Sequence, residues 1–140
     1  MKRVIVLRGT ENTGKTQTIK KVYELMLAKY QVTRVHEKIY KREITCVLLV
    51  NNKKIGIESQ GDPNSRLRRN LEYFVDINCE IIICATRTYG QTVDAVNTLS
   101  DNYEIVWIDK TIERISHNQS DINVGDANKI IKELEKAIGK

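Results

Sequence analysis

The feature that most constrains the fold is an apolar run that leads at once into a glycine-bounded loop and then into a helical pattern. Residues 4–7 are apolar and mostly β-branched, as a buried parallel strand requires. Residues 9–16 read GTENTGKT and match the pattern G-x-x-x-x-G-K-[ST] in full. Apolar residues then recur at helical spacing, at Ile19, Val22, Tyr23, Met26 and Tyr30. This order of strand, loop and helix predicts an α/β fold.

The loop at 9–16 also has the composition of a polyphosphate site. Its glycines let the backbone curl so that N–H groups converge on phosphate oxygens, and the helix that follows directs its positive end at the anion. Lys15 is placed to reach the β- and γ-phosphates, and the Thr16 hydroxyl to ligate Mg²⁺. The expected nucleotide-binding residues are therefore Gly9, Thr10, Glu11, Asn12, Thr13, Gly14, Lys15, Thr16 and Gln17.

On these residues the chain resembles the superfamily of P-loop-containing nucleoside triphosphate hydrolases. The match is firm over about the first thirty residues and concerns only the architecture beyond them. The resemblance implies a three-layer P-loop NTPase fold, with a nucleoside triphosphate and Mg²⁺ as ligands. It leaves open hydrolysis, phosphoryl transfer, or regulated binding by a module with little turnover, because one fold hosts many functions. ATP is expected rather than GTP, because no N-K-x-D-like guanine-reading motif follows.

The rest of the chain alternates strand and helix patterns and predicts one nucleotide-binding domain over residues 1–140. Asn51 and Asn52 tolerate a positive φ and indicate a hairpin turn. The expected sheet is therefore mostly parallel with one antiparallel hairpin strand, and the polar residues 116–123 are expected to form a mobile loop. Strands are expected at 32–40, 44–50, 54–59, 81–85 and 104–109, and helices at 63–76, 90–99 and 126–138.

Two acidic residues follow the strand at 54–59, at the end of a strand where ligands sit in an open α/β sheet. Glu58 stands roughly where P-loop enzymes carry the acid of their Mg²⁺ shell, although the usual pattern of four apolar residues followed by Asp is not present. Glu58 and Asp62 are both candidates for metal binding and for catalysis. Equally, Glu58 can be solvated, and Asp62, which precedes Pro63, can be the N-cap of the helix at 63–76.

Arginines near the expected phosphates are candidates for charge stabilisation. Arg87 follows the strand at 81–85 and is a candidate catalytic residue, either stabilising transition-state charge or binding a second substrate. Arg66 and Arg69 lie three residues apart on a helix, where they can clamp a phosphate or remain solvated. Thr88 and Gln91 fit a capping box at the next helix.

The composition favours a cytoplasmic protein with no membrane partner. No apolar run approaches the roughly 18 residues of a membrane span, and no signal peptide precedes the first strand. Cys46, Cys79 and Cys84 are odd in number and lie in or beside strand-like segments, as reduced core thiols do. The net charge of +5 is spread along the chain, so nucleic acid is not an expected partner, and any acceptor or protein partner is left open.

Overall fold

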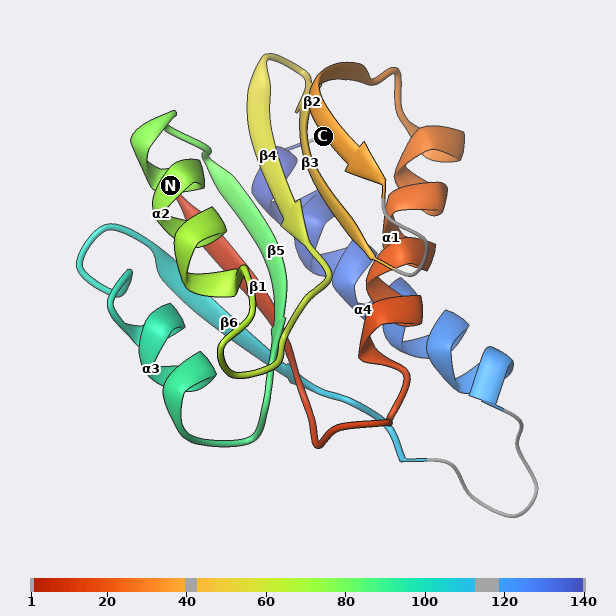
Figure 1. Cartoon of the computed structure of the whole chain (residues 1–140). Coiled ribbons are helices and arrows are strands. Elements are labelled where there is room, and N and C mark those ends of the chain that lie inside the picture. Colours follow the sequence, from red (N-terminus) through yellow and green to blue (C-terminus); the bar gives the residue numbers. More distant parts are fainter. Residues whose placement is uncertain (1, 40–42, 113–118, 140) are drawn as a thin grey trace.

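The computed structural model describes residues 2–39, 43–112 and 119–139. Within these ranges one six-stranded sheet, in the order β2-β3-β4-β5-β1-β6, lies between two pairs of helices (Figure 1). The strands are β1 (Arg3–Arg8), β2 (Thr33–Ile39), β3 (Ile44–Val50), β4 (Lys53–Glu58), β5 (Ile81–Thr86) and β6 (Glu104–Asp109), and the helices are α1 (Lys15–Lys29), α2 (Leu67–Asp76), α3 (Gln91–Asn97) and α4 (Gln119–Ile138).

The sheet is mixed because β3 runs against both of its neighbours. β3 pairs antiparallel with β2 and with β4, whereas β4 with β5, β5 with β1 and β1 with β6 are parallel pairs. The turn from β3 to β4 places Asn51 at φ 52° and Asn52 at φ 64°, a conformation that asparagine tolerates better than most residues. The expected α/β architecture with an antiparallel hairpin strand is therefore confirmed.

Each face of the sheet buries its own apolar cluster, which gives the molecule three layers. Ile5 and Leu7 of β1 face α1 and α4, and the alternate residues Val4 and Val6 face the side covered by α2 and α3. All four side chains are fully buried, which explains why β1 is continuously apolar. Burial of a side chain of this size contributes roughly 1.5–3 kcal/mol. In the described ranges no helix is both long and apolar enough to cross a membrane.

Helix α4 begins earlier than its apolar pattern indicates. The expectations of a helix at 126–138 and a loop at 116–123 were wrong for residues 119–123, which are helical; residues 116–118 lie outside the described residues. The pattern failed because Asn123 and Asp126 are polar and yet buried, at 5% and 1% exposure. A buried polar side chain breaks the apolar stripe on which a helix prediction rests.

Helix α2 begins later than expected, which corrects the interpretation of Asp62. The helix was expected at 63–76 with Asp62 as its N-cap, but it starts at Leu67 after a turn in which Asn64 has φ 58°. Gln60 Oε1 accepts from the N–H of Arg66, the residue before the helix, at 3.0 Å, and Ser65 Oγ accepts from Leu67 N at 3.3 Å, while the N-cap residue Arg66 makes no side-chain cap hydrogen bond. Asp62 therefore does not cap α2.

The capping box expected at Thr88 and Gln91 was also wrong. Helix α3 starts at Gln91 after Gly90, which has φ 93°, and no side chain caps its first turn. The hydroxyl of Thr92 accepts a hydrogen bond from Arg87 N at 2.9 Å instead. This bond ties the start of α3 to the chain segment that follows β5. The expected apolar environment of the cysteines is confirmed, since Cys46, Cys79 and Cys84 are free and buried.

Candidate functional site

A cavity of about 420 Å³ lies where the loop after β1 meets the turn after β4 and the start of α4. We call it the loop cavity. It brings together six of the nine expected nucleotide-binding residues, one of the expected acids and two residues that were not expected, Gly61 and Gln119. Its lining comprises Glu11, Asn12, Gly14, Lys15, Thr16, Gln17, Gly61, Asp62 and Gln119.

Each glycine of the loop has its own reason. Gly14 has φ 90°, a conformation that other residues rarely adopt, and a Cβ there would displace the side-chain ends of Gln119 at 2.6 Å and Asn123 at 2.7 Å. A Cβ at Gly9 would lie 2.8 Å from Lys110 Cβ, so a larger residue would push the loop away from the residue that follows β6. The glycine spacing of the motif thus matches the contacts that hold the loop in place.

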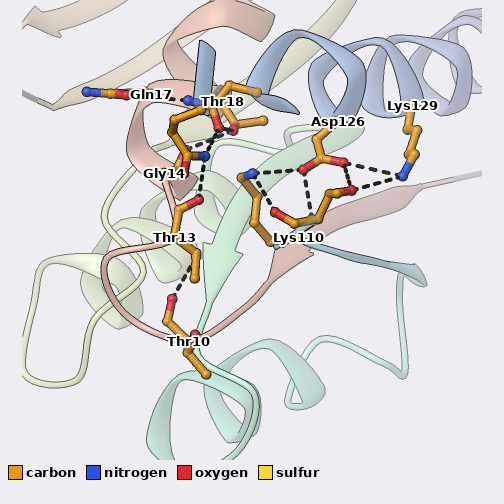
Figure 2. Close-up of polar contacts among 11 residues, drawn as sticks. Thr10, Thr13, Gly14, Gln17, Thr18, Lys110, Asp126 and Lys129 are labelled. Carbon is orange, nitrogen blue, oxygen red and sulfur yellow. Dashed lines mark hydrogen bonds and ion pairs between the residues drawn. The ribbon is translucent and has the colours of Figure 1, made fainter. Parts of the chain in front are cut away.

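The loop is closed by its own hydrogen bonds. Thr13 Oγ1 donates to the carbonyl of Thr10 at 2.8 Å, as Figure 2 shows. Thr16 Oγ1 lies 3.5 Å from the carbonyl oxygen of Ser59, and this contact joins the start of α1 to the residue after β4. The bond between Thr13 and Thr10 lies within the loop, and neither residue lines the loop cavity, whereas Thr16 does.

Lys15 is held beneath the loop. Its side chain lines the loop cavity, its residue is 7% exposed, and Nζ donates to the carbonyl of Gly9 at 2.7 Å. Burial lowers the pKa of Lys15 to about 8, against the opposing effects of Asp62 and Glu11. An anion entering the cavity would meet an ammonium group that lacks most of its water, and would favour its charged form.

Asp62 and Arg87 lie together at the edge of this cavity. Arg87 Nε donates to Asp62 Oδ1 at 2.9 Å, and an Arg87 terminal nitrogen lies 3.7 Å from Glu11 Oε2. The arginine therefore joins the turn after β4 to the loop after β1. The Asp62 side chain keeps 59% of its surface exposed, so its second oxygen remains accessible from the cavity.

Glu58 lies elsewhere and does not line the loop cavity. It is fully buried, so the interpretation as a solvated strand-end residue was wrong. Its carboxylate accepts from Thr45 Oγ1 at 2.8 Å, from Gln60 N at 2.9 Å and from Asn70 Nδ2, and it lies 3.8 Å from Arg66. These contacts join β3, β4 and α2, and they direct Glu58 away from Lys15.

Arg66 and Arg69 do not reach the loop cavity either. Arg66 lies against the carboxylates of Glu58 and Glu43, at 3.8 and 3.9 Å. Arg69 is exposed on α2 and lines a different surface hollow. Arg87 does not line the loop cavity, but it contacts Glu11 and Asp62 of the lining, whereas the other two arginines contact neither of these residues in any described ion pair.

Sequence reasoning missed the polar side chains of α4 that hold the loop. Gln119 Nε2 donates to the carbonyl of Thr13 at 3.0 Å and to Asn123 Oδ1 at 2.8 Å. Asn123 Oδ1 also accepts from Thr18 Oγ1 at 3.1 Å, and its Nδ2 donates to Gln17 Oε1 at 3.3 Å. The signal in the sequence was the four-residue spacing of Gln119 and Asn123, which places both on one helical face.

A second contact between α4 and the loop region is a buried ion pair, drawn in Figure 2. Lys110 Nζ lies 2.9 Å from Asp126 Oδ2, and both side chains are almost fully buried. Asp126 also accepts from Thr111 N at 2.9 Å and Thr111 Oγ1 at 2.6 Å, and lies 3.3 Å from Lys129. Burial raises the pKa of this carboxyl, but the hydrogen bonds from Thr111 and Lys110 outweigh it and lower the pKa below its usual value.

The metal-ligating groups of the site are few. Among the residues that the structure describes, no three His, Cys, Asp or Glu side chains are grouped as a metal cage. Mg²⁺ needs no such cage, because it is usually held by one or two protein oxygens, substrate phosphates and water. The Thr16 hydroxyl and the Asp62 carboxylate line one cavity and fit that requirement, whereas Glu58 does not face it.

Comparisons of the chain with protein-family models, with curated proteins and with solved structures give no match.

Proposed function

We propose that this protein binds a nucleoside triphosphate, preferably ATP, together with Mg²⁺ in the loop cavity. We propose further that it hydrolyses or transfers the terminal phosphate. The observation that carries the proposal is the position of the complete GTENTGKT motif. It connects a buried parallel strand to a helix, with Lys15 and Thr16 on one cavity at the carboxyl end of the sheet.

The chain's own residues divide the work of holding the triphosphate. The N-terminal end of α1 offers free backbone N–H groups and a positive dipole to the phosphates. The Lys15 ammonium, already desolvated, exchanges the Gly9 carbonyl for phosphate oxygens. The Thr16 hydroxyl and Asp62 are the groups that would hold Mg²⁺, which supplies charge neutralisation on the phosphate oxygens.

Arg87 and Asp62 are the groups that support chemistry at the terminal phosphate. Asp62 lines the cavity and can accept a proton from an attacking water or hydroxyl. Arg87 sits between Asp62 and Glu11, so its guanidinium is held beside the place where charge develops as the terminal phosphate leaves. Glu58 takes a positioning role here, because its carboxylate fixes the segment from Glu58 to Asp62 through Gln60 N.

A nucleotide-responsive module with little turnover is the second candidate. One observation favours it. Glu58 is buried in structural contacts and does not line the loop cavity, and Asp62, which does line it, is paired with Arg87. The expected acids are therefore both engaged within the protein. Such a protein would bind and release the nucleotide, and α4, which contacts the loop through Gln119 and Asn123, would carry the response.

Calorimetric titration with Mg²⁺-ATP tests the proposal. Wild type is expected to bind, and Lys15→Ala to lose measurable affinity, because the Lys15 side chain lines the loop cavity and its ammonium bonds to a carbonyl of the loop. Lys132→Ala, which removes an exposed lysine of α4, is the matched control and should bind normally. Bound nucleotide at about 100 times its dissociation constant should stabilise the fold by roughly 2.7 kcal/mol. Equal affinity in wild type and Lys15→Ala would refute the proposal.

Phosphate release, measured with ATP and with GTP, separates the two candidates. A hydrolase releases phosphate in repeated turnovers that need Mg²⁺ and prefer ATP, and a binding module releases little from either nucleotide. A phosphotransferase forms ADP only when an acceptor is supplied, so ADP formation is measured as well. Loss of turnover in Asp62→Asn with Mg²⁺-nucleotide affinity kept assigns proton acceptance to Asp62, whereas loss of that affinity as well assigns Asp62 to the Mg²⁺ ion.

A further inference from the structure

A second cavity adjoins the loop cavity and shares Asp62 with it. It measures about 170 Å³ and lies between the turn before α2, the first turn of α2 and the start of α3. We call it the helix cavity. Its lining comprises Asp62, Pro63, Asn64, Ser65, Leu67, Arg68, Gln91, Thr92 and Ala95. Asp62 therefore stands on the boundary between the proposed triphosphate site and a separate small space.

The lining of the helix cavity is divided between an apolar floor and a polar rim. Leu67, Thr92 and Ala95 are buried and form the floor, whereas Asn64 and Gln91 are exposed at the rim. Thr92 is the residue whose hydroxyl accepts from Arg87 N, so the floor is fixed to the same segment that carries the Arg87 guanidinium. A few placed polar groups around an apolar floor are typical of a small-molecule site.

Two charged side chains line the helix cavity. Arg68 is exposed, and it forms no ion pair with any residue in the described ranges. Asp62, on the boundary with the loop cavity, is held by Arg87. A ligand in this space would thus meet a cation and a carboxylate.

We propose that the helix cavity is the acceptor site of a phosphotransferase, and that it takes a small anion that carries a hydroxyl group. The inference rests on the proposed binding of a triphosphate in the loop cavity. The anionic group of the acceptor, a carboxylate or a phosphate, pairs with Arg68, and its hydroxyl lies against Asp62. The polar rim at Asn64, Ser65 and Gln91 holds the rest of the molecule.

The transfer step follows from this placement. The acceptor hydroxyl oxygen forms a bond to the γ-phosphorus of the triphosphate, and the bond from that phosphorus to the β,γ-bridging oxygen breaks. The electron pair of the broken bond leaves with the nucleoside diphosphate, and the hydroxyl proton goes to Asp62. The products are a nucleoside diphosphate and a phosphorylated anion.

Three small probes test the site: D-glycerate, glycerol 3-phosphate and uncharged glycerol, each added to wild type with Mg²⁺-ATP. Formation of ADP and of a phosphorylated product is measured. We expect at least one anionic probe to be phosphorylated and glycerol not to be, because glycerol has no anionic group to pair with Arg68. Activity with D-glycerate indicates a carboxylate acceptor, and activity with glycerol 3-phosphate indicates a phosphate acceptor.

Two neighbouring arginines of α2 provide the matched variants. Arg68→Gln should raise the KM for the anionic probe by about tenfold, which is the loss of one charge-assisted contact, with ATP affinity unchanged. Arg69→Gln is the control, because Arg69 is equally exposed but does not line the helix cavity, and it should leave both constants unchanged.

The outcomes separate this inference from the proposed function. No phosphorylated product from any probe, with ATP binding that still depends on Lys15, would overturn the acceptor site and leave the triphosphate site standing. An equal rise of KM in Arg68→Gln and Arg69→Gln would also overturn it. Absence of ATP binding in wild type would instead refute the proposed function itself.

Discussion

At the scale of single residues, Lys15 is the cation proposed to bind the phosphates, and its pKa is lowered. Burial lowers its pKa from 10.5 to about 8, because the ammonium has lost water that the Gly9 carbonyl replaces only in part. Between these two values the unfolded chain binds more protons than the folded one, so the stability of the fold rises with pH in that window. Below about pH 8 the buried charge costs stability.

Nucleotide binding should therefore take up a proton at about pH 9 and almost none at about pH 7, because the phosphates raise the lowered pKa of Lys15. Calorimetry in two buffers with different ionisation enthalpies measures this uptake. Lys15→Arg is the control, since its guanidinium stays charged and adds no uptake whatever its affinity. Equal proton uptake by wild type and Lys15→Arg at about pH 9 would show that another group titrates.

The acids illustrate which residues the sequence could place. Glu58 and Asp62 are four positions apart and equally plausible by pattern, yet one is fully buried and the other lines the cavity. The difference comes from Thr45, Asn70 and Arg66, which approach Glu58 from β3 and from the α2 region. No local pattern encodes those contacts, so the sequence could name the pair but could not choose between them.

At the scale of elements, α4 fastens to the end of β6 through the pair of Lys110 and Asp126. Both charges have left water, and a buried pair of this kind is stabilising only while both partners and their hydrogen bonds are present. Lys110 also packs against Gly9. The pair therefore holds α4 and the loop at residues 9–16 together.

Asp126→Asn should destabilise the fold by roughly 3–5 kcal/mol, because it leaves the Lys110 ammonium buried without its counterion. Urea unfolding measures the change. Lys129→Ala, which removes the exposed partner of the same carboxylate, is the control and should cost less than about 0.5 kcal/mol. Lys110→Met combined with Asp126→Leu should recover much of the loss. Equal effects of Asp126→Asn and Lys129→Ala would contradict this account.

Acid should weaken the same contact. The pKa of Asp126 is lower in the folded protein than its ordinary value of 3.8. The stabilisation is therefore complete above about pH 4 and is lost as the pH falls through the folded value.

Element boundaries show how far pattern reasoning extends. The strand before the loop at residues 9–16, the helix after it and the hairpin at Asn51 and Asn52 follow from local sequence, because apolar runs and positive-φ residues act locally. The starts of α2 and α4 do not. Aspartate and proline at 62–63 imitate the start of a helix that begins instead at Leu67. Asn123 is buried where it contacts Thr18 and Gln17 of α1, and no local pattern encodes that contact.

At the scale of the whole molecule, the net charge of +5 is not gathered into one basic face. Many basic side chains are matched by a nearby carboxylate, among them Arg3 by Glu104, Arg8 by Asp109, Lys53 by Glu80, Lys110 by Asp126 and Lys136 by Glu133. Arg68 and Arg69 on α2 are adjacent and exposed, and no described ion pair includes either of them.

Aromatic rings that would stack on nucleic-acid bases are also engaged inside the protein. Phe74 is fully buried against the sheet, and the ring of Trp107 is covered by the Arg8 guanidinium at 5.0 Å. Single-strand binders place such rings beside their basic residues, where bases can reach them. The exposed Tyr89 is a ring without a second one beside it among the described aromatic contacts.

We therefore expect single-stranded and duplex oligonucleotides to bind more weakly than a dissociation constant of about 10⁻⁴ M at physiological salt, the weak end of non-specific binding. Fluorescence anisotropy with labelled oligonucleotides at low and at physiological salt measures the affinity and its salt dependence. A double variant, Arg68→Gln with Arg69→Gln, shows whether any residual binding comes from α2. Micromolar binding that weakens steeply with salt and is lost in this variant would assign a nucleic-acid site to α2. Because that surface lies outside the loop cavity, such a result would not bear on the proposed triphosphate site. It would change only the partner that Arg68 is proposed to bind.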